Sequence, residues 1–211
     1  TTLTSFVAVG GTCSVSVRRD QSTNYQVSPA TTMTITVVKG TQTITYNSVA
    51  SSYYVLGTLN LGAVASSALP ISYSLGSGSS TYCSLNGSTV TFTAVGTCVV
   101  KADQAGNANV SAATQQSYSF TIAKNLQTIT FAAISDDFVR ATTLSLGATS
   151  SSTLAVTYAV AAGTTNSACT VTSTGVVTLS AVGVCSITAS QAGNANYEAA
   201  TDVTQTFNVA K

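Results

Sequence analysis

The sequence predicts an all-β protein built from tandem sandwich-like units of about 85 residues. Three observations lead to this prediction. The chain contains two long, closely similar segments and a weaker third copy. Apolar and polar residues alternate over short runs, which is typical of half-buried strands. Val, Ile, Thr and Tyr dominate the sequence, and these side chains fit a pleated sheet.

The repeat becomes visible when the sequence is aligned on cysteine. The segment AVGTCVVKADQAGNANVSAATQQSYSFTIAK at 94–124 matches AVGVCSITASQAGNANYEAATDVTQTFNVAK at 181–211. A weaker copy, AVGGTCSVSVRRDQSTNYQVSPATTMTITVVK, occupies 8–39, and in all three copies a Lys lies 26 residues after the Cys. The beginning of the unit recurs as QTITY and QTITF. We therefore expect three parts, namely the C-terminal half of an incomplete repeat at 1–39, a complete repeat at 40–124 and a second complete repeat at 125–211.

Each complete repeat contains seven strand-like runs that are separated by turn signals. In the first repeat the runs are 42–46, 58–63, 71–75, 82–85, 89–94, 97–103 and 117–123. Asn86-Gly87 between two alternating runs is a strong hairpin signal, and Thr174-Gly175 takes its place in the second repeat. Seven short strands in about 85 residues, with no helical pattern, indicate an immunoglobulin-like sandwich.

The repeat motifs also carry a resemblance to a known family. QTITF, a Cys pair around an AVGxC turn, and QAGNANYxAAT followed by QTFNVAK resemble the tandem immunoglobulin-like repeats of very large bacterial surface and secreted proteins. Those proteins are often adhesins or stalks, and the resemblance covers nearly the whole chain. It implies a cell-surface or secreted protein and brings no catalytic residues. The incomplete repeat departs from the pattern, with RDQSTN in place of QAGNAN.

The five cysteines follow the repeat. Each complete repeat contains two, Cys83 with Cys98 and Cys169 with Cys185, whereas the partner of Cys13 would precede residue 1. The strand order places both members of a pair at the same end of the sandwich, so one disulfide per complete repeat is geometrically reasonable. Such disulfides imply an oxidising, extracytoplasmic setting. Zinc is the competing interpretation, and it is weakened because the chain has no His and no C-x-x-C pair.

The composition leaves little room for catalysis. Without His, a Ser-His-Asp triad is impossible and a nucleophilic Cys lacks its usual base. The adjacent acidic pair Asp136–Asp137 is interpreted as a solvated loop, with weak calcium binding as the alternative. A net charge of +1 gives no electrostatic case for nucleic acid, and no apolar run approaches the ~20 residues of a transmembrane helix. We expect no enzyme activity, no cofactor, no metal, no nucleic-acid partner and no membrane insertion in this segment.

The stretch QAGNAN occurs twice, and we expect it to lead from the sixth strand into the loop before the seventh, beside the linker from the preceding repeat. The predicted loop residues are Gln104, Gly106, Asn109, Gln191, Gly193, Asn196 and, in the incomplete repeat, Asn24. Because Gln21 stands where the complete repeats have Gly, the sequence indicates that Gly is not an absolute backbone requirement. We expect the Asn residues at 24, 109 and 196 to fix the turn and the small residues to set how closely one repeat docks on the last. The stretch lacks aromatic and Arg anchors, so scaffold is favoured over ligand contact.

Together these observations predict a non-catalytic structural repeat, a stalk or spacer of a large extracellular surface protein. Two-residue linkers between repeats predict a semi-rigid rod whose partners are the neighbouring repeats of the same chain. The incomplete repeat adds a second possibility, assembly with identical chains into a filament or surface layer by β-strand addition. The alternative is a carbohydrate- or ice-binding adhesive module, which the many Thr residues suggest.

Overall fold

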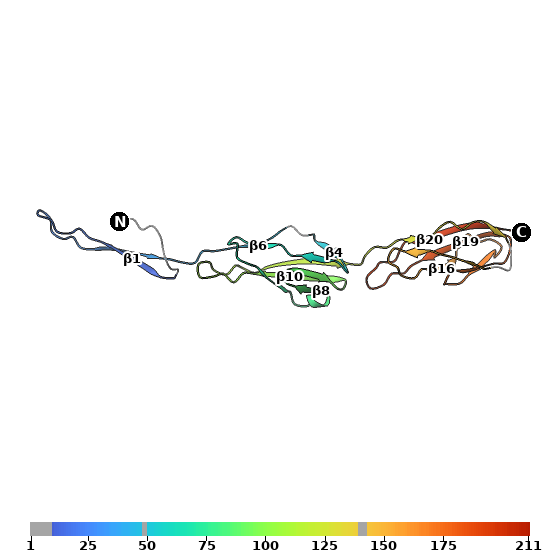
Figure 1. The fold of residues 1–211 in the computed structure, drawn as a ribbon, viewed down its shortest axis with the longest axis horizontal. Helices are drawn as coiled ribbons and strands as arrows, with labels where there is room; N and C mark the ends of the chain where they lie inside the picture. The colour runs from blue at the N-terminus through green and yellow to red at the C-terminus, as the bar shows by residue number, and fades with distance from the viewer. Residues whose placement is uncertain (1–9, 48–49, 139–142) are drawn as a thin grey trace. The chain divides into compact units, whose positions relative to one another are not determined.

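The computed structural model describes residues 10–47, 50–138 and 143–211. Within these residues the chain forms β-strands and one 3₁₀ turn, Ser79–Thr81, and no α-helix (Figure 1). The described residues group into two compact units. The first draws on Thr1–Ser51, Thr58–Thr91 and Cys98–Phe120, and the second on Ser52–Gly57, Phe92–Thr97 and Thr121–Lys211. The all-β prediction is confirmed.

The N-terminal part of the described chain is a two-stranded antiparallel hairpin. Its strands are β1 (Thr12–Val17) and β2 (Thr31–Thr36), and Cys13 lies opposite Ile35. Ser and Thr alternate with apolar residues along both strands, so one face is hydroxylated and the other apolar. Met33 on the apolar face is 59% exposed.

The first complete repeat forms one four-stranded sheet, a three-stranded sheet and a short strand pair. The sheets are ordered β4-β11-β10-β7 and β5-β9-β8, and β3 pairs with β6. The strands are β3 (Ile44–Tyr46), β4 (Ser52–Tyr54), β5 (Thr58–Asn60), β6 (Ala63–Ala65), β7 (Ser72–Leu75), β8 (Cys83–Asn86), β9 (Thr89–Phe92), β10 (Gly96–Asp103) and β11 (Gln116–Ala123). Two sheets with this connectivity correspond to an immunoglobulin-like sandwich.

The second complete repeat has the same arrangement. Its sheets are ordered β13-β20-β19-β16 and β14-β18-β17, and β12 pairs with β15. The strands are β12 (Ile129–Thr130), β13 (Asp137–Phe138), β14 (Thr143–Ser145), β15 (Thr149–Ser150), β16 (Thr157–Val160), β17 (Cys169–Val171), β18 (Val176–Leu179), β19 (Gly183–Ser190) and β20 (Val203–Ala210). The strand order along the chain therefore repeats between the two sandwiches.

A disulfide joins the two sheets of each complete repeat, as predicted. Cys83 of β8 is bonded to Cys98 of β10, and Cys169 of β17 is bonded to Cys185 of β19, with Cα atoms 6.1 Å and 5.7 Å apart. Both bonds lie in the core, which in the second repeat also contains Phe207, Ile187, Val177 and Leu179. Alternate residues of the long strands supply this core because successive strand side chains point to opposite faces.

Two details of the strands differ from the expected runs. The run 58–63 is interrupted at Leu61–Gly62, because β5 pairs with β9 whereas β6 pairs with β3. The segment Ser52–Tyr54 is a further strand, β4, which pairs in parallel with the end of β11 so that Tyr53 lies beside Ile122. A parallel pairing with a segment 69 residues away leaves no local sequence signal, since the strand has only three residues.

Candidate functional site

The first Gln of QAGNAN is part of a buried amide pair in the first complete repeat. The side-chain oxygen Oε1 of Gln104 accepts a hydrogen bond from Nε2 of Gln42, 2.7 Å away. The same Nε2 donates to the backbone oxygen of Ser111 at 2.7 Å, and Oε1 of Gln42 accepts from the hydroxyl of Ser67. Nε2 of Gln104 donates to the backbone oxygen of Pro70 at 3.2 Å. Because both amides are buried, these bonds satisfy groups whose burial without partners would be costly.

The second repeat builds the same pair from equivalent residues. Nε2 of Gln127 donates to Oε1 of Gln191 at 2.6 Å and to the backbone oxygen of Glu198 at 2.6 Å. The hydroxyl of Ser152 donates to Oε1 of Gln127. Gln42 and Gln127 were not among the residues predicted from the sequence, although they begin the repeated motifs QTITY and QTITF. The recurrence of this Gln in both motifs is the sequence signal that could have identified the partners of Gln104 and Gln191.

The glycine of the stretch is fixed by two geometric requirements. Gly106 and Gly193 have φ angles of +75° and +76°, a region that side chains rarely adopt. A Cβ atom on Gly106 would lie 2.3 Å from the backbone oxygen of Val110, and one on Gly193 would lie 2.4 Å from that of Tyr197. In the complete repeats the loop therefore requires glycine, whereas the incomplete repeat forms the same turn with Gln21 at this position.

The turn is held by the first Asn of the stretch and not by the second. Oδ1 of Asn107 accepts hydrogen bonds from the backbone N–H groups of Asn109 and Val110 at 2.8 and 2.9 Å. Asn194 does the same for Asn196 and Tyr197 at 2.8 and 3.0 Å. The expectation that the Asn109 and Asn196 side chains fix the turn is therefore wrong. An Asx turn needs the acceptor two residues before the donor, which the position of Asn107 meets.

Asn109 and Asn196 instead contribute backbone oxygens that bind the linker. The N–H of Gly40 donates to the backbone oxygen of Asn109 at 2.9 Å, and the N–H of Ser111 donates back to the oxygen of Gly40 at 2.9 Å. In the second repeat Asn125 makes the same two bonds, to Asn196 at 2.8 Å and from Glu198 at 2.9 Å. The loop thus pairs with the incoming chain as a short parallel β-bridge.

The two linkers differ in their side chains. Nδ2 of Asn125 donates to the backbone oxygen of Val55 at 2.9 Å, and both residues belong to the second compact unit. Gly40, at the equivalent position, has no side chain to make such a bond. The preceding Lys39 instead donates from Nζ to the backbone oxygen of Asn107 at 2.8 Å.

The incomplete repeat forms the same turn without the same side chains. The N–H of Ser22 donates to the oxygen of Tyr25 at 3.0 Å, as that of Asn107 does to Val110 at 2.9 Å. Asn24 is exposed in this loop. Arg19 replaces the buried Gln, and its guanidinium lies 3.8 Å from the ring centre of Tyr25. The backbone course of the loop therefore does not depend on the Gln pair in this copy.

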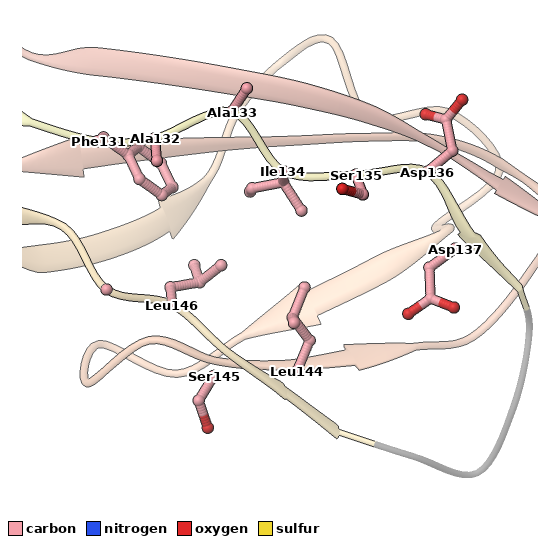
Figure 2. Close-up of a pocket in the computed structure, with 11 residues that line it drawn as sticks. Phe131, Ala132, Ala133, Ile134, Ser135, Asp136, Asp137, Leu144, Ser145 and Leu146 are labelled. Carbon is pink, nitrogen blue, oxygen red and sulfur yellow. The ribbon is translucent and has the colours of Figure 1, made fainter.

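The acidic pair and the cysteines show no assembled metal site. Asn208 donates to the two carboxylate oxygens of Asp136, from its backbone N–H at 2.7 Å and from Nδ2 at 3.2 Å, and these bonds hold the pKa of Asp136 below its usual value. Figure 2 shows the Asp136 and Asp137 carboxylates pointing to different sides of the chain. Cys13 is half-buried and unbonded. Within 10–47, 50–138 and 143–211, no three His, Cys, Asp or Glu residues gather in a metal-binding arrangement.

A shallow groove of about 320 Å³ lies beside this acidic pair. Figure 2 shows the side chains of Ile134, Leu144 and Leu146 turned toward one another along it, with Phe131 at one end. Apolar and polar residues share the lining, since Ser135, Asp136, Asp137 and Ser145 lie among the apolar side chains.

The comparisons with known proteins were made on both sequence and structure. No family model matches the sequence, and the search of curated proteins found no match. Among solved structures, mouse protocadherin-24 EC1-3 matches with a TM-score of 0.39 and 12% identity, over 94% of this chain and 79% of that chain. Human protocadherin-24 EC1-2 (Form II) gives 0.33 and 12%, over 80% and 99%. Domains 4 and 5 of the S-layer protein SbsC give 0.34 and 15%, over 81% and 98%.

Likeness at this level says nothing about what the present chain binds. In the described part of the chain, no helix is both long enough and apolar enough to cross a membrane.

Proposed function

We propose that this chain is a non-catalytic structural segment, a stalk or spacer of a large surface or secreted protein. The observation that carries the proposal is the linker bridge, because Gly40 and Asn125 enter equivalent loops by the same two backbone hydrogen bonds. A loop that is used twice to receive the preceding chain serves the connection between repeats. The residues of QAGNAN contribute a buried amide, a turn and backbone oxygens, and the stretch contains no aromatic or Arg residue that could anchor a ligand.

The extracellular location is proposed from the chemistry of the core. Two disulfides, each joining the sheets of one repeat, are stable in oxidising compartments and rare in reducing ones. A chain with 6% charged residues and many Ser and Thr hydroxyls suits a protein that depends little on electrostatic attraction to its partners. The family resemblance adds a bacterial origin and an adhesin or stalk parent to the proposal. An absence of nucleic-acid binding is part of it, because the net charge is +1.

Single-molecule force spectroscopy on the 211-residue chain tests the stalk function. We expect two unfolding events, one per complete repeat, because a stalk bears load through separately folded units. Reduction should lengthen each event by the 15 or 16 residues that a disulfide encloses, roughly 50 Å of extended chain. Unfolding in one step at low force would count against a load-bearing role. Small-angle scattering should show an extended particle, and a compact one would contradict the rod.

Assembly of identical chains into a filament or surface layer is a finer form of the proposal. It predicts that the molecular mass rises with concentration in analytical ultracentrifugation, and a monomer at all concentrations would exclude it. A carbohydrate- or ice-binding module gains no specific support. Hydroxyls on the flat faces bond one another across strands, as Thr188 and Thr204 do at 2.8 Å and Ser16 and Thr32 at 2.7 Å. Binding on a glycan array or to ice would revive it.

A further inference from the structure

The N-terminal hairpin has the strand register of the two long strands that end a complete repeat. Cys13 lies opposite Ile35 in β1–β2, and Cys185 lies opposite Phe207 in β19–β20, so both pairs are shifted by the same 172 positions. Four apolar residues of the hairpin therefore correspond to core residues of the second repeat, namely Cys13 to Cys185, Val15 to Ile187, Val17 to Ala189 and Ile35 to Phe207. The fifth, Met33, corresponds to the polar Gln205. The hairpin therefore matches β19–β20 in strand pairing as well as in sequence alignment.

The equivalent residues differ sharply in exposure. Cys185, Ile187 and Ala189 of β19 are fully buried. Their counterparts in β1 are Cys13 and Val15, which are half-buried, and Val17, which is 67% exposed. An isolated two-stranded hairpin is at best marginally stable in water. The apolar face of β1–β2 is thus a core surface that the described part of the chain leaves uncovered.

The complete repeats show what covers this face. In the second repeat β17 and β18 cover it, contributing Cys169, Val177 and Leu179 to the same core. Cys169 is also the disulfide partner of Cys185. A segment that covers the apolar face of β1–β2 in the same way must therefore present an apolar sheet face and a cysteine that lies opposite Cys13. The other four cysteines of the chain are already paired with one another, so none of them is available.

We propose that the apolar face of β1–β2 is covered by the front half of a repeat of this same type, on the same chain directly before the hairpin, and that its cysteine forms a disulfide with Cys13. In both complete repeats the front half immediately precedes the back half, and the paired cysteines are 15 and 16 residues apart. The same spacing puts the partner of Cys13 ahead of Thr1. Formation of this disulfide requires an oxidant. A low-molecular-weight disulfide such as oxidised glutathione accepts the two electrons and two protons of the two cysteine thiols and is itself reduced to two glutathione thiols.

The loop of the hairpin agrees with this occupant. Asn24 and Gln26 hold the positions at which Asn109 and Ser111 bind the backbone of Gly40. The turn between Ser22 and Tyr25 keeps the backbone bonds of the complete repeats. The hairpin is thus shaped to receive both a front half-repeat and the linker that leads into it. The proposal concerns completion of this repeat and is independent of the stalk function.

A graft within the full chain tests the proposal. Residues 1–11 are replaced by a copy of residues 40–96, which is the part of the first complete repeat that precedes its second cysteine. The graft places a second copy of Cys83 15 residues before Cys13, the separation found between Cys83 and Cys98. After refolding with oxidised glutathione, digestion without reduction should yield a peptide that links Cys13 to the grafted cysteine. Hydrogen exchange of the β1 and β2 amides should slow at least tenfold relative to the ungrafted chain.

Two controls separate the disulfide from the covered face. A graft with Ser in place of its cysteine should leave Cys13 as a free thiol, which iodoacetamide labels after denaturation, while the hairpin amides of the folded protein stay protected. A graft with Asp at the positions of Val90 and Phe92 should lose the protection, because both side chains are buried in the native first repeat. The proposal is overturned if Cys13 remains alkylated and the hairpin exchanges as before in the first graft. It is also overturned if the ungrafted chain already protects the hairpin as a Cys13-linked dimer.

Discussion

In the two complete repeats the equivalent loop binds the equivalent linker, yet the repeats differ at other positions. The Gln pair, the glycine and the first Asn are identical, whereas Gly40 corresponds to Asn125 and Tyr46 to Phe131. In the complete repeats these identical residues meet a backbone constraint or form buried amide hydrogen bonds. The differing ones contribute single contacts. The comparison teaches that identity between the copies is concentrated where the connection between repeats is made.

The largest expected effect is at the glycines. Gly193→Ala should destabilise the second repeat by about 3 kcal/mol or more, because it adds the strain of a positive φ to an overlap with the backbone. Gly106→Ala should do the same to the first. Hydrogen exchange, read separately for each repeat, provides the measurement. Gly147→Ala is the matched control, since no atom lies within 4 Å of its Cβ position. Equal stability of Gly193→Ala and this control would show that the loop adapts to a side chain.

The buried amide pair should give the next largest effect. Gln127→Leu removes the donor to the oxygen of Glu198 and one of the two donors to Oε1 of Gln191, which keeps the N–H of Gly193. We expect a loss of about 2 kcal/mol. Gln42→Leu should cost a similar amount in the first repeat. In urea unfolding, the Gln127→Leu/Gln191→Leu double variant should lose less than the sum of the single variants. Strict additivity would mean that the two amides do not act as a pair.

A stabilising change is expected at Tyr46. Its hydroxyl is buried and has no hydrogen-bond partner among the described residues, whereas the second repeat has Phe131 at this position. Tyr46→Phe should therefore stabilise the first repeat by about 1 kcal/mol. Phe131→Tyr should destabilise the second, and the pair of variants is measured by thermal unfolding at pH 7. Destabilisation by Tyr46→Phe would indicate that the hydroxyl is satisfied.

The same residue gives a pH dependence with a defined sign. Desolvation, with smaller contributions from Tyr73 and Asp103, raises the pKa of Tyr46 from 10.0 to about 12. The folded state thus holds this proton more tightly than the unfolded state, so the contribution of Tyr46 is fully present below pH 10 and is lost as the pH rises toward 12. Brief denaturant titrations between pH 9 and 12 should show a smaller fall in stability for Tyr46→Phe than for the parent. Parallel curves would contradict the shift.

The smallest effect on stability is expected at the linker. Asn125→Gly removes one hydrogen bond to the oxygen of Val55, and we expect a loss of about 0.5–1.5 kcal/mol. Its larger consequence should be a broader distribution of distances between dyes placed on the two complete repeats, measured by single-molecule fluorescence transfer. Asn125→Ala is the control, because it removes the same bond without the added backbone freedom of glycine. An unchanged distribution in both variants would show that the Asn125 side chain does not restrain the junction.

The sequence was a good guide wherever the repeat itself carried the information. The spacing of Cys83 and Cys98, and of Cys169 and Cys185, was sufficient to predict the two disulfides. The short alternating runs predicted most strands, and Asn86-Gly87 predicted the hairpin between β8 and β9. The sequence was misleading at the loop in one respect, because the second Asn was taken to fix the turn, whereas the first Asn provides the hydrogen-bond acceptor.

What the sequence by itself determined is the all-β repeat, its cysteine pairing and the position of QAGNAN between the last two strands. These features follow from local alternation and from residues that recur at a fixed spacing. Only the tertiary structure decided that Gln104 meets Gln42, that β4 runs parallel to β11, and that Asn109 offers a backbone oxygen to Gly40. Each of these contacts joins residues at least 62 positions apart. Their geometry exists only after the sheets have packed, so no local pattern announces it.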